Sequence, residues 1–243
     1  HPVAHSFPTR RSSDLSVMTG EHIVRSYDTD IDELVNTISE MGGVAESQVA
    51  DALAALTRRD AEAAERVITV DARLDALEEK VDQMSVHLFA KRQPMAQDLR
   101  LIAMSLKISN DLERIGDYAA SVAKRAKRLE PGLQLNAIGS LGRMGAMVQE
   151  MLTDVLDAYI ERDDRQAMSV WHRDAEVDDF YDSLFRELIT YVLEDPRTTS
   201  ACIDLLFVAK NLERIGDHAT NIAERIHYVM HGDRINRVRS EPA

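Results

Sequence analysis

Several residue types are scarce in this chain of 243 residues, and each scarcity excludes a class of protein. Its one cysteine, Cys202, excludes a disulfide framework and any metal site built from several thiolates. Aromatic residues make up only 5% of the chain, whereas hydrophobic residues make up 44%, a balance that suits helices better than β-sandwiches or barrels. No apolar run approaches the length of about 18 residues that is typical of a membrane-spanning helix. We therefore predict a cytoplasmic protein.

Basic residues are also fewer than acidic residues. Lys and Arg total 29 against 42 Asp and Glu, so the formal net charge is −13. A protein that binds nucleic acid needs a basic face to neutralise phosphates, and we therefore expect no nucleic-acid partner. The sequence also lacks a glycine-rich phosphate-binding loop, a nucleophile elbow and a catalytic triad. These absences favour a protein that is not an enzyme.

The first seventeen residues differ from the rest of the chain. They contain two of the six prolines, show no helical period and lack the long apolar core of a signal peptide. Within them, the run FPTRRSSDL from Phe7 to Leu15 resembles the translation of a sequencing adapter. We interpret residues 1–17 either as a non-native leader, with Met18 as the native start, or as a disordered arm.

Proline is absent from residues 18–93 and 132–195, and this permits long helices because proline interrupts helix interiors. Apolar residues in these stretches recur at intervals of three and four, the spacing of one helix face. One such stripe begins at Leu74 and ends at Leu88. We predict six long helices, over residues 26–57, 61–91, 96–128, 134–160, 164–192 and 197–229.

The two halves of the chain resemble each other. The segment MGGVAESQVADALAALTRRD at 41–60 aligns with MGAMVQEMLTDVLDAYIERD at 144–163, and Leu-Glu-Arg-Ile-Gly-Asp at 112–117 recurs at 212–217. An internal repeat of this length indicates two copies of one structural unit. We predict an all-α fold, a tandem repeat of two antiparallel three-helix bundles with short turns. The predicted units are residues 18–130 and 133–230, and a disordered tail is expected over 231–243.

Carboxylates recur at helical spacing in both repeats. Glu113 and Asp117 are four residues apart and share one helix face, as do Glu213 and Asp217. In a chain this acidic several such pairs arise by chance, so the spacing alone has little weight. The turns between consecutive helices add a second constraint, because residues equally far from a turn lie at the same height on antiparallel helices.

This constraint predicts a box of four carboxylates in each bundle. About the turn near Pro94, Asp71 lies opposite Asp117 and Asp75 opposite Glu113; about the turn near Pro196, Asp174 lies opposite Asp217 and Asp178 opposite Glu213. The first box is Asp71, Asp75, Glu113 and Asp117, and the second is Asp174, Asp178, Glu213 and Asp217.

Boxes of like charge are unfavourable alone, so their repetition suggests a bound cation. Oxygen ligands suit hard cations such as Mg²⁺, Mn²⁺, Ca²⁺ or iron. The alternative is a structural salt-bridge network through Arg114 and Arg214.

Gly116 and Gly216 are predicted inside helices, and indicate either close helix packing or backbone room beside the carboxylates. Lys124 follows the first box where Glu224 follows the second, which favours the second box, whereas Lys210 before Glu213 replaces Asn110 and favours the first. Because a lysine can turn its charge into water and Glu224 can reach the cation, we expect the second box to bind metal more tightly.

Two histidines of the second repeat offer weaker signals. Glu224 and His227 have the Glu-x-x-His spacing of di-iron bundles, but such sites need two of these motifs, and the corresponding first-half segment is Lys-Arg-Ala-Lys. We therefore keep a carboxylate-bridged di-metal enzyme only as the alternative function. His218, which replaces Tyr118 of the first repeat, is interpreted as a surface histidine.

At these residues the chain resembles the PhoU family, the phosphate uptake regulators of bacteria. The resemblance rests on the opening His22-Ile23-Val24 and Tyr27-Asp28, on Met41-Gly42-Gly43, and on the duplicated Asn-(Asp)-Leu-Glu-Arg-Ile-Gly-Asp core. The core occupies residues 110–117 and 211–217, and one departure is the asymmetry between Asp111 and Asn211.

The resemblance implies two three-helix bundles, usually in a homodimer, with metal clusters on repeated Glu/Asp-x-x-x-Asp motifs at the eight carboxylates of the two boxes. The metal remains open among Mg, Mn, Fe and Zn. It also implies an adaptor that links the phosphate-specific ABC transporter to a sensor histidine kinase. Such an adaptor keeps the phosphate-starvation regulon off and restrains uptake when phosphate is plentiful. Any association with a membrane would be peripheral, through these partners.

Overall fold

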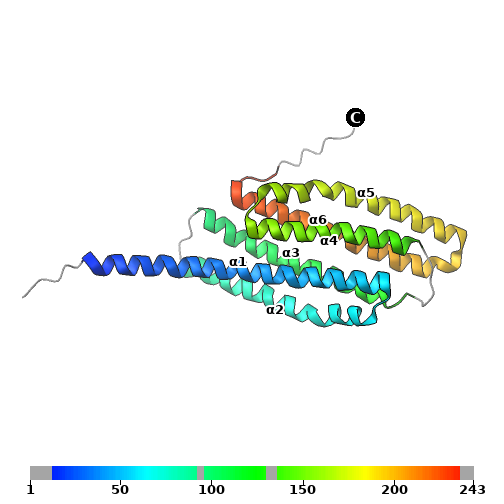
Figure 1. Cartoon of the computed structure of the whole chain (residues 1–243), viewed down its shortest axis with the longest axis horizontal. Helices are drawn as coiled ribbons and strands as arrows, with labels where there is room; N and C mark the ends of the chain where they lie inside the picture. The colour runs from blue at the N-terminus through cyan, green and yellow to red at the C-terminus, as the bar shows by residue number, and fades with distance from the viewer. Residues whose placement is uncertain (1–12, 92–95, 130–135, 236–243) are drawn as a thin grey trace, which may run out of the picture.

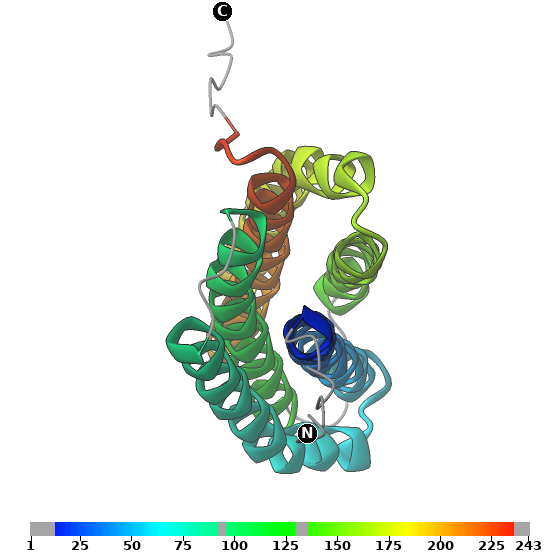
Figure 2. The same cartoon turned by 90° about the vertical axis from the view of Figure 1, so that its left-hand side faces the viewer.

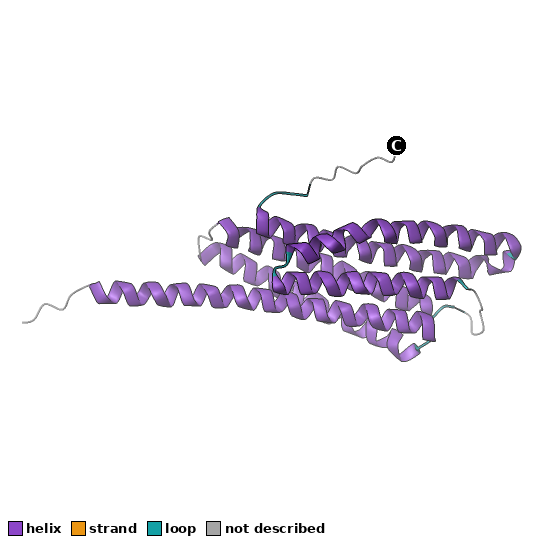
Figure 3. Ribbon diagram, turned by 45° about the horizontal axis from the view of Figure 1, so that its top comes forward, coloured by secondary structure: helices purple, strands orange, loops and turns teal. Residues whose placement is uncertain are grey.

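The computed structural model describes residues 13–91, 96–129 and 136–235, apart from the side chains of 13–26, Asp71 and Lys91. Within these ranges the fold consists of helices without any strand, which confirms the predicted all-α class (Figure 3). None of these helices is both long and apolar enough to cross a lipid bilayer. The elements are α1 (Ser13–Arg58), α2 (Ala61–Lys91), α3 (Ala96–Ala126), α4 (Ala137–Glu161), α5 (Asp164–Glu194), the short 3₁₀ helix η1 (Pro196–Thr198) and α6 (Thr199–His231).

The main departure from the predicted boundaries lies at the start of the chain. Helix α1 begins at Ser13, inside the segment expected to be a leader and well before the predicted residue 26. Serine and aspartate at positions 13 and 14 are residue types that favour a helix start. Residues 1–12 and 236–243, which include most of the expected leader and tail, lie outside the described residues.

The same turn joins the first two helices of each bundle. Arg59 after α1 and Arg162 after α4 adopt left-handed backbone conformations, with φ of 59° and 55°. The next residues, Asp60 and Asp163, each accept a hydrogen bond from a backbone N–H of the following helix, at 2.9 Å and 2.8 Å. A left-handed residue ends a helix and an aspartate caps the next one, so the identical Arg-Asp pairs of the repeat encode identical turns.

The six helices lie side by side along the long axis of the molecule (Figure 1). Helices α1, α2 and α3 form one bundle and α4, α5 and α6 the other, as predicted. The bundles meet where α1 contacts α4 and α3 contacts α6, so these four helices form the centre of the molecule. Helices α2 and α5 flank this centre on opposite sides (Figures 1 and 2). Each predicted box therefore takes its residues from one central helix and one flanking helix.

Two glycines allow α1 and α4 to approach each other closely. A Cβ atom added to Gly42 would lie 2.4 Å from Leu156 Cδ2, and one added to Gly145 would lie 2.1 Å from Leu53 Cδ2. Gly42 and Gly145 are equivalent in the repeat, and so are Leu53 and Leu156. The same contact is therefore made twice, as in an interface between two copies related by a two-fold axis.

A buried ion cluster joins α3 to α6. Asp111, only 3% exposed, lies with Oδ1 2.9 Å from His218 Nδ1 and Oδ2 3.1 Å from Arg225 Nε. His218 is half-buried and paired, so its interpretation as a surface histidine was wrong. At the equivalent place, Asn211 donates a hydrogen bond to Ser121 Oγ at 2.9 Å. The asymmetry between Asp111 and Asn211 thus matches a charged environment at one position and a neutral hydroxyl at the other.

Candidate metal centre

The second predicted box converges in the structure. Asp178 on α5 and Glu213 and Asp217 on α6 each place one carboxylate oxygen within 4.8 Å of the other two. Asp174, one turn before Asp178, accepts a hydrogen bond from Thr220 Oγ1 at 3.2 Å. Three of the four predicted residues therefore form a set of oxygen ligands close enough for one cation, and the fourth lies beside it.

Glu213 is a largely enclosed member of the converging carboxylates. Its side chain is 12% exposed, and Oε1 lies 2.6 Å from the ammonium of Lys210. Its other oxygen, Oε2, is buried and accepts no hydrogen bond from the described residues. A buried carboxylate oxygen without a partner is costly, and a cation would satisfy it. The all-oxygen set around it suits a hard divalent cation such as Mg²⁺ or Mn²⁺. The residues present therefore fit the predicted metal.

The electrostatics of the second box disfavour four free negative charges. Desolvation between the helices, followed by the negative charges of Glu213, Asp174 and Asp178, raises the pKa of Asp217 to about 6, against a lowering effect of Lys210. A raised pKa means that the folded protein holds a proton where the unfolded chain would release it. A divalent cation can replace that proton and neutralise the same charges.

The first box is organised differently. Burial and the negative charges of Asp117 and Glu78 raise the pKa of Glu113 to about 7, while Arg114 lowers it. The guanidinium of Arg114 lies 3.6 Å from Glu113 Oε2 and 3.5 Å from Asp117 Oδ2. This box thus already holds a cationic side chain against both of its α3 carboxylates, as the salt-bridge alternative expected.

The α2 half of the first box departs from the prediction. Asp75 is exposed, and the side chain of Asp71 lies outside the described residues. Among the described side chains of the first bundle, no three carboxylates converge as they do in the second. Glu78 takes part instead, because it acts on Glu113 and accepts a hydrogen bond from Asn110 Nδ2 at 3.2 Å. Glu78 lies three residues after Asp75 and is as far from the turn near Pro94 as Asn110 is. This was the signal in the sequence that the predicted box left out.

The two glycines beside the boxes have different surroundings. A Cβ on Gly116 would lie 2.5 Å from Leu74 Cδ2 and 2.8 Å from Gln48 Oε1, whereas the nearest atom to one on Gly216 would be 3.5 Å away on Val177. None of these neighbouring atoms belongs to a carboxylate. Close helix packing therefore explains Gly116, and Gly216 has room for a methyl group.

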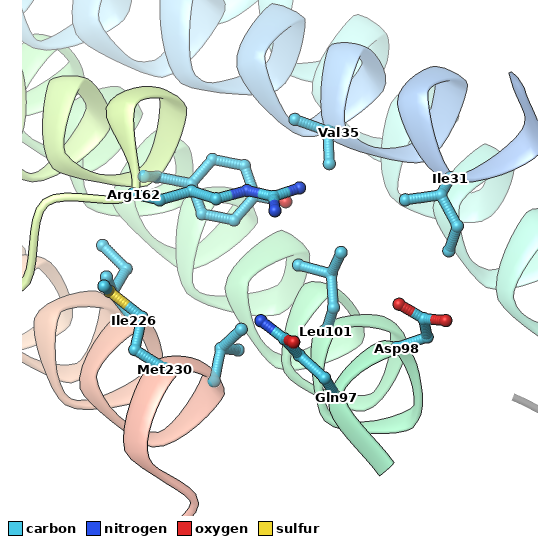
Figure 4. Close-up of a pocket in the computed structure, with 10 residues that line it drawn as sticks. Ile31, Val35, Gln97, Asp98, Leu101, Arg162, Ile226 and Met230 are labelled. Carbon is cyan, nitrogen blue, oxygen red and sulfur yellow. The ribbon is translucent and has the colours of Figure 1, made fainter. Parts of the chain in front are cut away.

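A separate cavity of about 250 Å³ lies where α1, α3 and α6 meet the end of α4 (Figure 4). Its wall is largely apolar. Arg162 extends over the cavity, and Gln97 and Asp98 lie across from it. The lining residues do not include the predicted box carboxylates, so the cavity forms no part of the metal centre.

The PhoU domain model matches residues 38–126 and 141–226, one match for each bundle. A Caulobacter vibrioides protein named phosphate-specific transport system accessory protein PhoU homolog is 51% identical over 220 residues, which cover 90% of this chain and 96% of that protein. A Rhizobium meliloti protein of the same name is 45% identical over 216 residues, with coverage of 88% and 91%.

Solved structures show the same architecture. The crystal structure of PhoU from Pseudomonas aeruginosa has a TM-score of 0.83 and 39% sequence identity, and it covers 85% of this chain and 100% of that one. The phosphate transport system regulatory protein PhoU from Streptococcus pneumoniae has a TM-score of 0.80 at 28% identity, with coverage of 86% and 99%. With one domain match per bundle and relatives similar over nearly their whole length, the chain belongs to the PhoU family.

Proposed function

We propose that this chain is an accessory protein of phosphate-specific transport that acts as a cytoplasmic adaptor and not as an enzyme. The observation that carries the proposal is the 51% identity, across nearly the full length of both chains, to a protein named as such an accessory protein. In this role the chain contacts the phosphate ABC transporter and a sensor histidine kinase. It restrains uptake and keeps the phosphate-starvation regulon off when phosphate is plentiful.

The second box supplies a metal-binding element to this adaptor. Asp178 from α5 and Glu213 and Asp217 from α6 would hold a hard divalent cation between the two helices. The bound cation neutralises their charge and thereby fixes the flanking helix α5 against the central helix α6. The support is geometric: the oxygens lie within 4.8 Å of one another, and Glu213 contributes a buried oxygen without a hydrogen-bond partner among the described residues.

A second copy of the chain is the partner we propose for an exposed apolar surface on the second bundle. Phe185, Ile189 and Leu193 recur at intervals of four along α5, and Ile203 and Phe207 do so on α6; all five are between 42% and 78% exposed. Exposed apolar surfaces of this kind mark interaction sites, and two-fold homodimers are the commonest oligomers.

Light scattering on purified wild-type protein should give the mass of a dimer, and the double variant Phe185→Asp/Ile189→Asp should have the mass of a monomer. A monomeric wild type would refute the dimer and leave this surface to another partner.

The adaptor role is tested in the host organism. Deleting the gene should raise expression of a phosphate-starvation reporter in phosphate-rich medium, and re-expressing the wild-type chain should restore repression. A reporter that stays at the wild-type level after deletion would contradict the regulatory role.

The enzymatic alternative makes the opposite biochemical prediction, since a di-metal enzyme loaded with Mn²⁺ or iron should turn over generic phosphoesters or consume O₂. The adaptor should do neither.

A further inference from the structure

Three potential metal ligands gather at the other end of the second bundle, away from the acidic box. They are Asp164, the first residue of α5, and His227 and His231, in the last two turns of α6. Asp164 precedes Asp178 by fourteen residues, which is about 21 Å along a helix. This cluster is therefore spatially separate from the carboxylates assigned above.

The three side chains already converge. Asp164 Oδ1 lies 2.7 Å from His227 Nδ1, and Asp164 Oδ2 lies 3.0 Å from His231 Nε2. The two imidazole rings are neighbours, with centroids 4.5 Å apart. One ligand atom from each residue lies within 4.8 Å of the other two. Two imidazole nitrogens and a carboxylate oxygen are thus directed at one small volume.

Local sequence explains why these groups meet. His227 and His231 are four residues apart on α6, the same i,i+4 spacing by which two histidines on one helix face bind zinc in metalloproteases. Asp163 caps α5 and thereby fixes Asp164 in its first turn, where the helix dipole favours a carboxylate. His231 lies in the last turn of α6, where the dipole favours a cation.

We infer that Asp164, His227 and His231 form a second type of metal site, which binds a borderline transition-metal cation such as Zn²⁺. Imidazole nitrogens suit Zn²⁺, Co²⁺, Ni²⁺ and Cu²⁺, whereas Mg²⁺ prefers oxygen alone, so this site and the acidic box select different metals. Zinc bonds of about 2.0–2.2 Å place neighbouring tetrahedral ligands roughly 3.3 Å apart. The two Asp164–histidine contacts, at 2.7 Å and 3.0 Å, would therefore lengthen slightly, and any ligand atoms that lie as far as 4.8 Å apart would move closer together. Water would complete the coordination.

A metal at this position would connect the start of α5 to the end of α6. Val229 and Met230, which lie between the two histidines in sequence, line the cavity of Figure 4. Glu224, one turn before His227, accepts a hydrogen bond from the indole N–H of Trp171 at 3.2 Å, which also ties α6 to α5. The proposed cation would therefore reinforce an existing connection between the two helices and hold one wall of the cavity in place.

The first experiment is a Zn²⁺ titration of the metal-free full-length chain. Wild type is compared with the double variant His227→Asn/His231→Asn, and His87→Asn, an exposed histidine on α2, serves as the matched control. We expect the double variant to lose one equivalent of Zn²⁺ or to bind it at least about tenfold more weakly, because losing even an outer-shell partner costs about 10- to 100-fold. His87→Asn should bind as wild type does. Equal stoichiometry and affinity in the double variant and the wild type would overturn the site.

A second measurement uses wild-type protein and does not depend on how the variant folds. Carbethoxylation of each histidine is followed by mass spectrometry with and without Zn²⁺. We expect Zn²⁺ to slow modification of His227 and His231 while His87 reacts unchanged, and Mg²⁺ to protect neither. Identical rates at His227 and His231 with and without Zn²⁺ would contradict the proposal. The protection of His227 and His231 by Zn²⁺ should persist in a variant that alters only the acidic box, Asp178→Asn/Glu213→Gln/Asp217→Asn.

Discussion

At the scale of single residues, Gly116 and Gly216 occupy equivalent positions in the two repeats but have different neighbours. The side chains that an added Cβ on Gly116 would meet, Leu74 and Gln48, are only 1% and 2% exposed, so they cannot move aside easily. At Gly216 the added Cβ would make ordinary contacts with Val177.

The two alanine substitutions should therefore change stability in opposite directions. Gly116→Ala is expected to lower the free energy of unfolding by about 1–3 kcal/mol through overpacking, partly offset by better helix propensity. Gly216→Ala is expected to raise it by up to about 1 kcal/mol, because the propensity gain meets little opposition. Urea denaturation of both variants checks this. A Gly116→Ala protein as stable as Gly216→Ala would show that the packing around residue 116 is looser than described.

Glu113 and Asp217 should make the stability of the metal-free protein depend on pH. Their folded pKa values, about 7 and about 6, lie above the unfolded values of about 4. The folded state then binds more protons than the unfolded state between these limits, so stability is full below about pH 4 and is lost as the pH rises through 6 to 7. The loss arises because like charges must be ionised inside the fold.

We predict that Glu113→Gln/Asp217→Asn has a smaller loss of melting temperature between pH 5 and pH 7.5 than wild type does, both without metal. Asp179→Asn, at an exposed acid on α5, is the control and should keep the wild-type pH dependence. Thermal melts followed by circular dichroism are sufficient. If the double variant lost as much melting temperature as wild type over this range, these two carboxylates would not be the source of the dependence.

At the scale of helices, the caps can be tested individually. Asp163 accepts hydrogen bonds from the backbone N–H groups of Arg165 and Gln166 at the start of α5. Asp163→Ala should lower the free energy of unfolding by about 1 kcal/mol, whereas Asp163→Asn should preserve most of the cap because asparagine is also a good N-cap. Equal losses in the two variants, measured by denaturation, would indicate that the charge of Asp163 and not its capping oxygen stabilises the turn.

Most helix boundaries followed from proline positions and apolar spacing, because both act locally along the chain. The register across each turn was also predictable. Asn110 contacts Glu78, and the ammonium of Lys210 lies 5.2 Å from the ring centroid of Tyr181. In each pair, the two residues are equally far from the turn that joins their helices. The start of α1 at Ser13 was missed, because residues 1–17 show no apolar period that would place a helix there.

The composition of the boxes was only partly predictable. Equal distance from a turn fixes the height of a residue on its helix but not the direction in which its side chain points. Asp178 therefore met Glu213 as expected, while Asp75 remained exposed on α2. The pairing of Asp164 with His227 and His231 was missed because the Glu-x-x-His spacing relates His227 only to Glu224.

At the scale of the whole molecule, the repeat has produced two acidic clusters of unequal character. Arg114 contacts both Glu113 and Asp117 in the first, whereas the direct contact of Lys210 in the second is with Glu213. A guanidinium against two ligands competes with an incoming cation, so we predict that the second box binds divalent metal more tightly.

The sequence predicts the same ranking from Glu224, but the carboxylate of Glu224 accepts a hydrogen bond from the indole N–H of Trp171. Because Arg114 competes with a cation at the first box, Arg114→Gln should strengthen Mn²⁺ binding there, as measured by titration of metal-free protein. Unchanged binding there would show that Arg114 does not compete with the metal.

We propose that the converging carboxylates of the second bundle bind a divalent cation. Calorimetric titration of metal-free protein with Mn²⁺ measures this binding, and compares wild type with Asp178→Asn/Glu213→Gln/Asp217→Asn and with the control Asp179→Asn. We expect the triple variant to lose the tightest site, with binding at least about tenfold weaker, while the control binds as wild type does. Wild-type Mn²⁺ binding by a triple variant of unchanged helicity would contradict it.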